Sequence, residues 1–460
     1  MDPGFRSAQS GLQVERATAL KAQERVACPS RSHTSTATVI TKTDPHYGGA
    51  MNTPTSSAPF YGWRIVAAAF VLAVFGWGLG FYGPPIYLHA VQEARGWSVT
   101  LISAAVTVHF LFGAVVVANM PGLYRRFGVP TVTKAGAIAL ASGIIGWAVA
   151  HEPWQLFLAT LLSGAGWVTM GAAAVNAIVS PWFVRNRPAA LSSAYNGSSV
   201  GGIVFAPLWV AAIGLLGFPL AATALGLVMI VTVWVVADTY LAKTPRDMGL
   251  APDGDFVSSS TVAVMSASAR PLAGRKLWSN LQFVTLASGM ALGLFAQIGL
   301  IAHLYSLLVP ALGAQFAGVA AGTATAAAIA GRTIVGWLMP VGADRRLFAC
   351  ASTTVQILGS LMFWLAAGDN VPLLLCGVVL FGAGIGNTTS LPPLIAQVEF
   401  TGDDVPRVVP LIIAIGQATY ALAPAAFGLV REFAPPSQLF VAAAVIQILS
   451  IVAFLSGRRR

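Results

Sequence analysis

Long apolar segments alternate with short polar stretches from about residue 60 to the end of the chain. A helix needs about 20 apolar residues to cross the hydrocarbon core of a bilayer. Twelve segments are long enough, and they lie at 63–90, 98–120, 131–150, 154–180, 188–214, 218–241, 280–309, 316–340, 347–367, 371–397, 405–430 and 437–456. The pattern therefore predicts an all-α membrane protein with twelve transmembrane helices.

Lysine and arginine are distributed unevenly among the predicted loops. The even-numbered loops and the C-terminus carry sixteen of these residues, whereas the odd-numbered loops carry only Arg95 and Arg431. Because cytoplasmic loops of membrane proteins carry an excess of Lys and Arg, this bias predicts that both termini lie in the cytoplasm. We expect a multi-pass protein of the cell membrane, with a bacterial inner membrane as its location.

The overall composition agrees with a membrane protein and excludes several other classes. Of the 460 residues, 56% are hydrophobic and 9% are charged, compared with about 25% charged residues in soluble domains. The net charge of +10 does not indicate a nucleic-acid partner, because the basic residues lie between apolar runs and form no basic face. Three scattered cysteines are too few for a disulfide framework or a metal cluster, and no cofactor is expected.

Two polar regions divide the chain. Residues 1–58 lack an apolar run and are predicted to be a disordered cytoplasmic tail. Met51 is the expected native start, which would make the preceding 50 residues an extension of the gene model. The polar stretch 243–279 is predicted to be a cytoplasmic linker between a six-helix bundle at 59–242 and another at 280–457. This arrangement resembles the two parallel repeats of major facilitator transporters, in which the substrate site lies near the membrane midplane.

Local motifs resemble the same superfamily. PGLYRRFGVP at 121–130 resembles the signature G-x-L-x-D-R-x-G-R-R between helices 2 and 3, with Arg126 and Gly128 in matching positions and Arg125 in place of the acid. RGWSVTLIS at 95–103, WFVRNRPAALSSAYNGSSVG at 182–201 and TPRDMGLAPDG at 244–254 are similar to segments of monocarboxylate-type and oxalate/formate-type carriers. The resemblance covers roughly 60 to 457 and implies the major facilitator fold.

Arg332 is the charged residue within a predicted span that most needs a functional explanation. An arginine at the centre of a membrane helix costs about 2.5–3.5 kcal/mol on insertion scales. Its planar guanidinium can bind a carboxylate through two parallel hydrogen bonds, and no acid lies in the middle of any predicted span. The carriers that the chain resembles bind the substrate carboxylate with an arginine on helix 8, where Arg332 falls. The alternative is a structural role, in which Arg332 pairs with an acid or caps backbone carbonyls.

Six further polar residues within the spans are candidates for substrate contact, each with a structural role between helices as the alternative. They are His303, Gln297, Asn387, Gln417, Tyr420 and His109. A second set is expected to serve gating or close helix packing, with plain kinks as the alternative for the two prolines. It comprises Arg125, Arg126, Gly128, Gly197, Gly201, Pro392 and Pro393.

Together these features predict a secondary transporter of a small organic anion, a monocarboxylate, that works by alternating access. Proton symport and anion exchange both remain open, so protons or a counter-anion are the expected partners besides the lipid bilayer. The alternative within transport is an exporter of drug-like or aromatic compounds. A membrane enzyme or sensor is disfavoured, because the sequence contains no HExxH, GxSxG or paired-carboxylate motif and no sizeable soluble domain.

Overall fold

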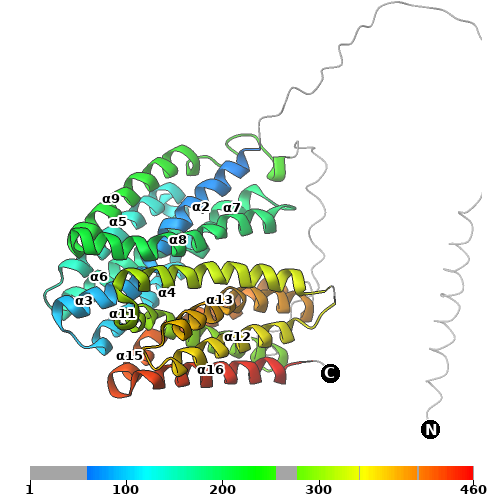
Figure 1. The fold of residues 1–460 in the computed structure, drawn as a ribbon. Helices are drawn as coiled ribbons and strands as arrows, with labels where there is room; N and C mark the ends of the chain where they lie inside the picture. The colour runs from blue at the N-terminus through cyan, green and yellow to red at the C-terminus, as the bar shows by residue number, and fades with distance from the viewer. Residues whose placement is uncertain (1–59, 255–276, 341, 401–403, 459–460) are drawn as a thin grey trace, which may run out of the picture. The chain divides into compact units, whose positions relative to one another are not determined.

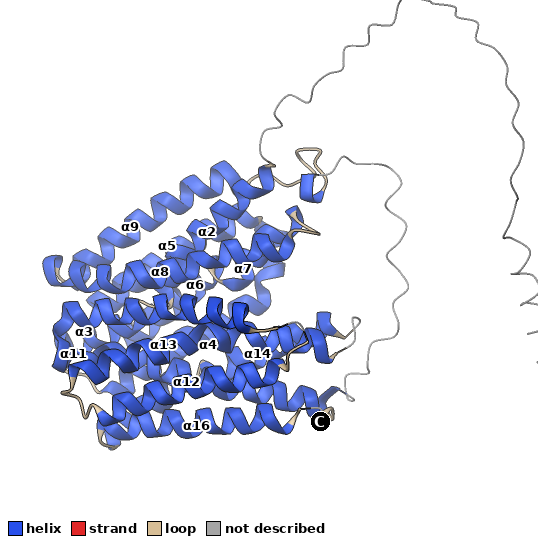
Figure 2. Ribbon diagram, turned by 45° about the vertical axis from the view of Figure 1, so that its right-hand side comes forward, coloured by secondary structure: helices blue, strands red, loops and turns tan. Residues whose placement is uncertain are grey.

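The computed structural model describes residues 60–254, 277–340, 342–400 and 404–458. The predictions for the tail 1–58, including a start at Met51, and for most of the linker 243–279 fall outside these residues. Residues 58–460 form one compact unit. Every regular element within the described residues is helical, as the apolar pattern predicts (Figure 2).

The helices fall into two groups that pack mainly among themselves. The N-terminal group contains α2 (Tyr61–Gly80), α3 (Pro84–Arg95), α4 (Val99–Phe127), α5 (Val129–Val149), α6 (Pro153–Trp167), α7 (Ala172–Val179), α8 (Arg187–Leu216) and α9 (Phe218–Val236). The C-terminal group contains α11 (Leu281–Leu338), α12 (Arg345–Leu365), α13 (Val371–Glu399), α14 (Val405–Tyr420), α15 (Ala423–Phe433) and α16 (Pro436–Ser456). Figure 1 shows the two groups one above the other.

By length and hydropathy, the described residues contain 11 candidate membrane spans. The count differs from twelve because α11 covers both 280–309 and 316–340. A helix of 58 residues would be about 87 Å long at 1.5 Å per residue, about three times the hydrocarbon core. The chain instead reverses within α11, since Arg346, which follows it, contacts Gln282 and Thr285 at its start. Gly313 lies at the reversal with φ 71° and ψ 161°, outside the helical range.

Three predicted spans contain a break. The first, 63–90, is interrupted between α2 and α3, where Pro84 and Pro85 cannot donate backbone hydrogen bonds to the preceding turn. The span 154–180 is interrupted at 168–171, and the span 405–430 at 421–422. By contrast, α4 continues to Phe127 through most of the predicted loop 121–130.

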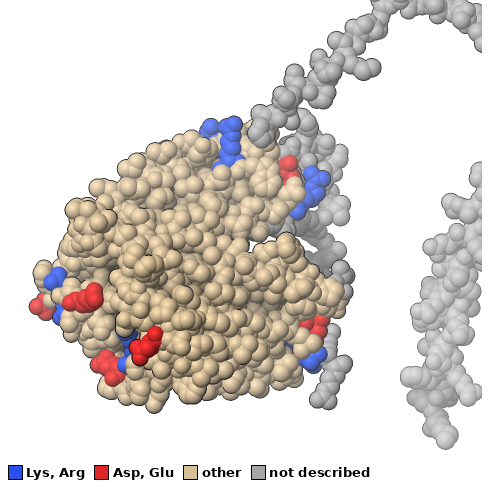
Figure 3. Space-filling model, viewed as in Figure 1, with Lys and Arg blue, Asp and Glu red and all other residues tan. Residues whose placement is uncertain are grey.

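The two groups contact each other toward one end of the helices, which we call the joined end. There α15 packs on α4, and α11 packs on α3 and α8. The opposite end, which we call the linker end, carries the segment that connects the groups. In Figures 1 and 2 the joined end lies on the left, and the groups spread apart toward the linker end on the right. Figure 3 shows charged side chains at both ends and a broad uncharged belt between them.

Candidate functional site

Arg332 lies on the returning half of α11, between the two helix groups. Its Nε atom donates a hydrogen bond to the Gly386 carbonyl on α13 at 3.3 Å, and its guanidinium lies within electrostatic range of the Tyr82 hydroxyl on the N-terminal group. The residue is exposed. Among the described residues it forms no ion pair, so its terminal N–H groups are available to an anion.

Gly386 allows this arrangement because it has no side chain. A Cβ atom at this position would lie 3.1 Å from Arg332 Nε and 2.5 Å from the Ala328 carbonyl oxygen. The Gly386 carbonyl also accepts hydrogen bonds from Thr389 and Ser390 at 3.1 and 3.0 Å. Gly386 therefore brings α13 close to α11 and fixes one edge of the guanidinium.

A small cavity lies next to the arginine, on its joined-end side. It has a volume of about 30 Å³ and both groups line it, with Tyr82, Pro85 and Ala206 on one side and Leu304 and Thr325 among the residues on the other. The Tyr82 and Thr325 side chains both line it, and the Thr325 hydroxyl donates to the Ala321 carbonyl at 3.4 Å. Apart from these two residues and Tyr305, the lining is apolar.

Three aromatic residues at or beside the helix breaks meet around Phe110. Its ring centroid lies 5.8 Å from Phe81, 6.0 Å from Trp167 and 5.9 Å from Tyr420. Phe81 lies in the break between α2 and α3, Trp167 ends α6 and Tyr420 ends α14. The Phe110–Tyr420 pair joins the two groups directly, so this aromatic cluster connects the broken helices to the contact between groups.

His109 is buried, and both of its ring nitrogens are hydrogen-bonded. Nδ1 lies 2.8 Å from the Ser163 hydroxyl, and Nε2 lies 2.9 Å from the Gly80 carbonyl at the end of α2. A neutral imidazole satisfies both bonds by donating from Nε2 and accepting at Nδ1. The structure thus places His109 in support of the helix break rather than near Arg332.

His303 lies toward the joined end and is fully buried. Its Nε2 lies 3.3 Å from the Pro424 carbonyl, and its Nδ1 lies 3.5 Å from the guanidinium of Arg431. Arg431 also donates a hydrogen bond to the Ser306 hydroxyl. A proton on Nδ1 would face the arginine, so the neutral tautomer that donates to Pro424 fits these contacts.

The remaining predicted contact residues lie in three different surroundings. Gln297 is buried and accepts a hydrogen bond at 2.9 Å from Gln356. Asn387 is buried two residues after the cavity-lining Ile385, about 200° further around α13. Gln417 and Tyr420 are half-buried near the end of α14. The structure therefore does not gather the predicted set around Arg332.

The predicted packing glycines and prolines fall into two cases. A Cβ atom at Gly197 or Gly201 would lie 2.2 Å from the Phe70 carbonyl or 2.5 Å from the Val74 carbonyl, so α8 packs directly on α2. Pro392 and Pro393 lie inside α13, which continues from Val371 to Glu399.

The loop signature lies at the linker end. Arg125 and Arg126 occupy the last turn of α4 and are exposed. Gly128, with φ 78°, makes the turn into α5. These positions agree with the resemblance of this segment to the superfamily signature, whose role in gating stays a prediction.

At the joined end, helix α15 and the N-terminal part of α4 form a direct polar contact. The Thr100 backbone N–H, in the first turn of α4, donates to the Glu432 carboxylate at 2.9 Å. The Ala425 backbone N–H donates to the Thr107 hydroxyl at 3.0 Å. Between these bonds, a Cβ atom at Gly428 would lie 2.6 Å from Ser103. The RGWSVTLIS motif thus supplies one face of the contact between groups.

At the linker end, the TPRDMGLAPDG and WFVRNR motifs bind each other. The Asp253 carboxylate accepts hydrogen bonds from the backbone N–H groups of Val184, Arg185 and Asn186 at 2.9, 2.8 and 3.1 Å. Slight burial acts to raise the pKa of Asp253, but these N–H groups and the charge of Arg185 outweigh it and lower the pKa below its ordinary value. The carboxylate therefore holds the start of α8 to the segment after α9.

Comparison with known proteins identifies the family. Residues 66–424 match the Major Facilitator Superfamily. The chain belongs to this superfamily. It is 25% identical over 370 residues to "MFS-type transporter 1" of Ophiocordyceps sp., covering 74% of this chain and 72% of that protein. It is also 25% identical over 358 residues to "MFS transporter asaE" of Aspergillus flavus, covering 73% of each.

A solved structure shares the superfamily fold. A crystal structure of a mutant of the nucleoside transporter NupG is 12% identical, with a TM-score of 0.67, and the match covers 86% of this chain and 100% of that one. The superfamily consists of transporters, so this chain is a multi-pass membrane transporter of the major facilitator type.

Several residues of the site carry no signal that the sequence alone could separate from ordinary packing. Tyr82, Thr325 and Gly386 are common residue types in membrane helices. The contact between groups brings Tyr82 to Arg332, whereas Gly386 reaches it through the packing of α13 on α11, and Thr325 lies about two turns before it on α11. Arg431 counted as a loop residue in the sequence, whereas its side chain turns back to His303 and Ser306. The pair Pro84–Pro85 was the one sequence signal that could have located the break next to Tyr82.

Proposed function

We propose that this transporter carries a small organic anion, a monocarboxylate, and that Arg332 binds its carboxylate. The observation that carries the proposal is an exposed arginine between the two helix groups with no acidic partner among the described residues. A bound anion would supply the missing charge, and a carboxylate matches the free edge of the guanidinium. The cavity beyond Tyr82 and Thr325 has room for about one water molecule, so we propose that its apolar side chains contact the carbon chain of the substrate after the two groups part.

The contacts of the two buried histidines bear on the coupling mechanism. His109 and His303 each fit as neutral rings with both nitrogens in use. Among the described residues, Glu399 pairs with Arg346 and Asp238 with Lys134 near helix ends, so neither acid serves Arg332. We infer that charge is carried by the substrate carboxylate itself, with either a co-transported proton or an exchanged counter-anion.

The proposed topology has twelve crossings, since Gly313 divides α11 into two helices that run in opposite directions. The Lys and Arg bias then supports a linker end that faces the cytoplasm, together with both termini. The bacterial inner membrane remains our prediction for the location.

A second candidate is export of drug-like or aromatic compounds. The aromatic cluster of Phe81, Phe110, Trp167 and Tyr420 favours it, because aromatic side chains contribute large apolar contacts. In that case Arg332 would serve structure alone, and an uncharged ligand would bind as well as an acid.

Equilibrium binding of an aliphatic monocarboxylate and its uncharged amide to the purified protein separates the two candidates. We expect the acid to bind and the amide not to, and Arg332→Ala to weaken acid binding about 100-fold, the loss of a charged bidentate contact. Arg332→Lys should recover part of that loss, and Arg246→Ala on the linker-end surface should change nothing. Equal binding of acid and amide, or full affinity in Arg332→Ala, would refute the carboxylate role.

A further inference from the structure

Helix α8 of the N-terminal group packs antiparallel on the returning half of α11, and the contacts between them fix which residues lie at the same level. A Cβ atom at Gly318 would lie 2.8 Å from the Val210 side chain, and one at Gly202 would lie 2.7 Å from the Thr325 side chain. Between these two contacts the chain moves from 318 to 325 on α11 and from 210 to 202 on α8. This register can be followed toward the linker end.

The register places Tyr195 level with Arg332. Arg332 lies seven residues after Thr325, which is about 10 Å further along the helix axis. Tyr195 lies seven residues before Gly202, the same distance toward the linker end. Because seven residues make nearly two full turns, Tyr195 leaves α8 on about the same side as Gly202, which faces Thr325 and the Tyr82 ring. Tyr195 and Arg332 therefore lie on opposite walls of the space where the groups spread apart (Figure 1).

The Tyr195 hydroxyl is held within its own group. The side chain is half-buried, and the hydroxyl donates to the Ala172 carbonyl at 3.0 Å. Ala172 is the first residue of α7, directly after the break at 168–171, and Asn176 one turn further is exposed. A hydroxyl can rotate to a new acceptor, and a bond to an ionised acceptor is roughly twice as strong as one to a neutral carbonyl. A carboxylate within reach would therefore compete well for this donor.

We propose that Tyr195 is the ligand that the N-terminal group contributes to the bound anion. Its hydroxyl turns from the Ala172 carbonyl to the carboxylate held by Arg332 when the groups approach each other at the linker end. The role of Tyr195 rests on the proposed function of Arg332, because both residues hold the same carboxylate. A contact made only after closing lets the anion favour the closed state, since a ligand shifts an equilibrium only by its difference in affinity between the two states.

Equilibrium binding of butyrate to the purified full chain tests this role by removing one oxygen atom. Tyr195→Phe keeps the ring and loses the hydroxyl, and we expect affinity to fall about tenfold, which corresponds to one hydrogen bond to a charged group. The matched control is Tyr61→Phe. Tyr61 is also half-buried, and its hydroxyl also donates to a backbone carbonyl, that of Thr239 at 3.3 Å. Because Tyr61 begins α2 at the linker end, its variant should bind butyrate as the wild type does.

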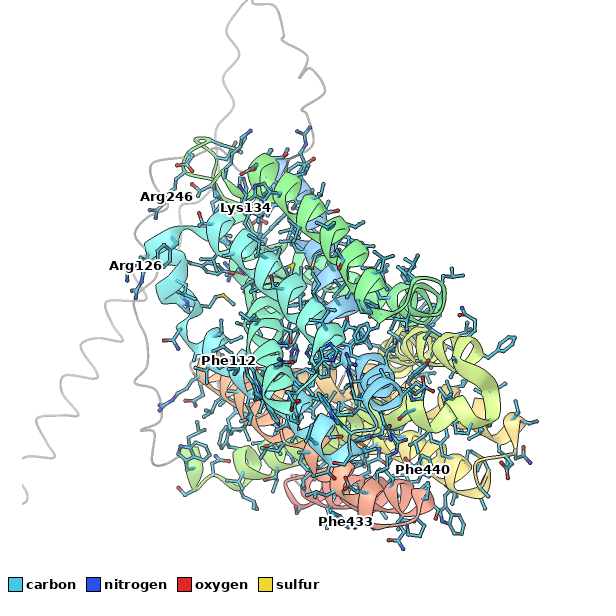
Figure 4. The ribbon with its side chains drawn as sticks, turned by 90° about the vertical axis from the view of Figure 1, so that its left-hand side faces the viewer. Phe112, Arg126, Lys134, Arg246, Phe433 and Phe440 are labelled. Atoms are coloured by element: carbon cyan, nitrogen blue, oxygen red, sulfur yellow. The ribbon has the colours of Figure 1, made fainter. Side chains whose placement is uncertain are left out.

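Spin labels at Arg246→Cys and Gln397→Cys, in a background without native cysteines, measure whether butyrate draws the groups together. Both residues are exposed, and Figure 4 shows Arg246 at the surface of the N-terminal group. Saturating butyrate should shorten the distance at the linker end in the wild type and in Tyr61→Phe. In Tyr195→Phe the distance should stay long, because the anion is then held from one side.

The outcomes separate this role from that of Arg332. Full affinity and normal closing in Tyr195→Phe, with binding lost in Arg332→Ala, would overturn the role of Tyr195 and leave the proposed function intact. Full affinity in Arg332→Ala would overturn both. Equal losses in Tyr195→Phe and Tyr61→Phe would show a general effect of losing a phenol, and would also overturn the role of Tyr195.

Discussion

Arg332 depends on a neighbour that contributes no side chain. Gly386→Ala would place a methyl group 2.5 Å from the Ala328 carbonyl and 3.1 Å from Arg332 Nε, which forces α13 and α11 apart. The guanidinium would then lose the hydrogen bond that fixes its position. We expect substrate affinity to fall about tenfold, which corresponds to the loss of one hydrogen bond to a charged group.

Gly336→Ala is the matched control for that substitution. Gly336 lies one turn beyond Arg332 on the same helix, and an added Cβ there meets no atom within 4 Å. If both variants bind the carboxylate equally well, the proposed positioning of Arg332 by Gly386 is wrong. Affinities measured as for Arg332→Ala provide the comparison.

His109 is expected to contribute to stability and not to proton transfer. In His109→Ala the Gly80 carbonyl and the Ser163 hydroxyl each lose a buried partner, which costs about 2–4 kcal/mol in total. Unfolding of the purified protein measures this loss, and the exposed His151→Ala serves as control. A stable His109→Ala protein whose transport no longer responds to a pH gradient would show instead that His109 carries a proton.

At the scale of helices, Glu432 of the C-terminal group accepts a hydrogen bond from the first turn of α4 in the N-terminal group, and so caps a helix of the other group. In Glu432→Ala the first turn of α4 loses an acceptor that belongs to the other group. A lost helix cap usually costs about 1 kcal/mol. We therefore expect the fraction of molecules whose two groups are separated at the joined end to rise roughly fivefold. Distances between spin labels at His151→Cys and Gln438→Cys, in a background without native cysteines, report this separation.

The control for this prediction is a glutamate that caps a helix within one group. Glu152 forms a reciprocal capping box with Gln155 at the start of α6. Glu152→Ala should lower stability without lengthening the distance at the joined end. A similar lengthening in both variants would mean that general destabilisation, rather than the inter-group cap, controls the separation.

Asp253 provides the corresponding contact at the linker end. Its pKa is lowered in the folded protein, so its stabilising contribution is present above the ordinary carboxyl pKa of about 3.9 and is lost as the pH falls through the lowered value. Asp253→Asn should cost about 1 kcal/mol at neutral pH, like a lost cap, and should flatten the acid limb of the stability curve. Asp369→Asn, at an exposed position whose carboxylate accepts no hydrogen bond among the described residues, should retain that limb.

The apolar pattern predicted the helices well, and their breaks less well. The positions and order of the spans follow from runs of about 20 apolar residues, because any helix that crosses the hydrocarbon core of a bilayer needs such a run. The breaks at 168–171 and 421–422 have no such signal, because they depend on contacts such as Trp167 with Phe110 and Thr107 with Ala425. Likewise, a buried glutamine such as Gln297 could belong to a site or to the hydrogen bond with Gln356, and the sequence alone does not distinguish them.

At the scale of the whole molecule, the contacts described between the groups lie from the level of Arg332 to the joined end. Phe110 with Tyr420, Thr100 with Glu432, and the packing of α8 on α11 all join the groups there. An anion bound at Arg332 would lie between the groups, beneath these contacts. This is the arrangement that alternating access requires, since the groups can part on one side of a site while they stay joined on the other.

The most direct test is uptake of labelled monocarboxylates into proteoliposomes that contain the wild type or Arg332→Ala. It is measured with and without a pH gradient, and with an anion preloaded inside. The account predicts saturable uptake by the wild type that unlabelled carboxylates compete away and their amides do not, and its loss in a folded Arg332→Ala protein. Undiminished carboxylate uptake by Arg332→Ala would contradict the central claim that this arginine binds the transported anion.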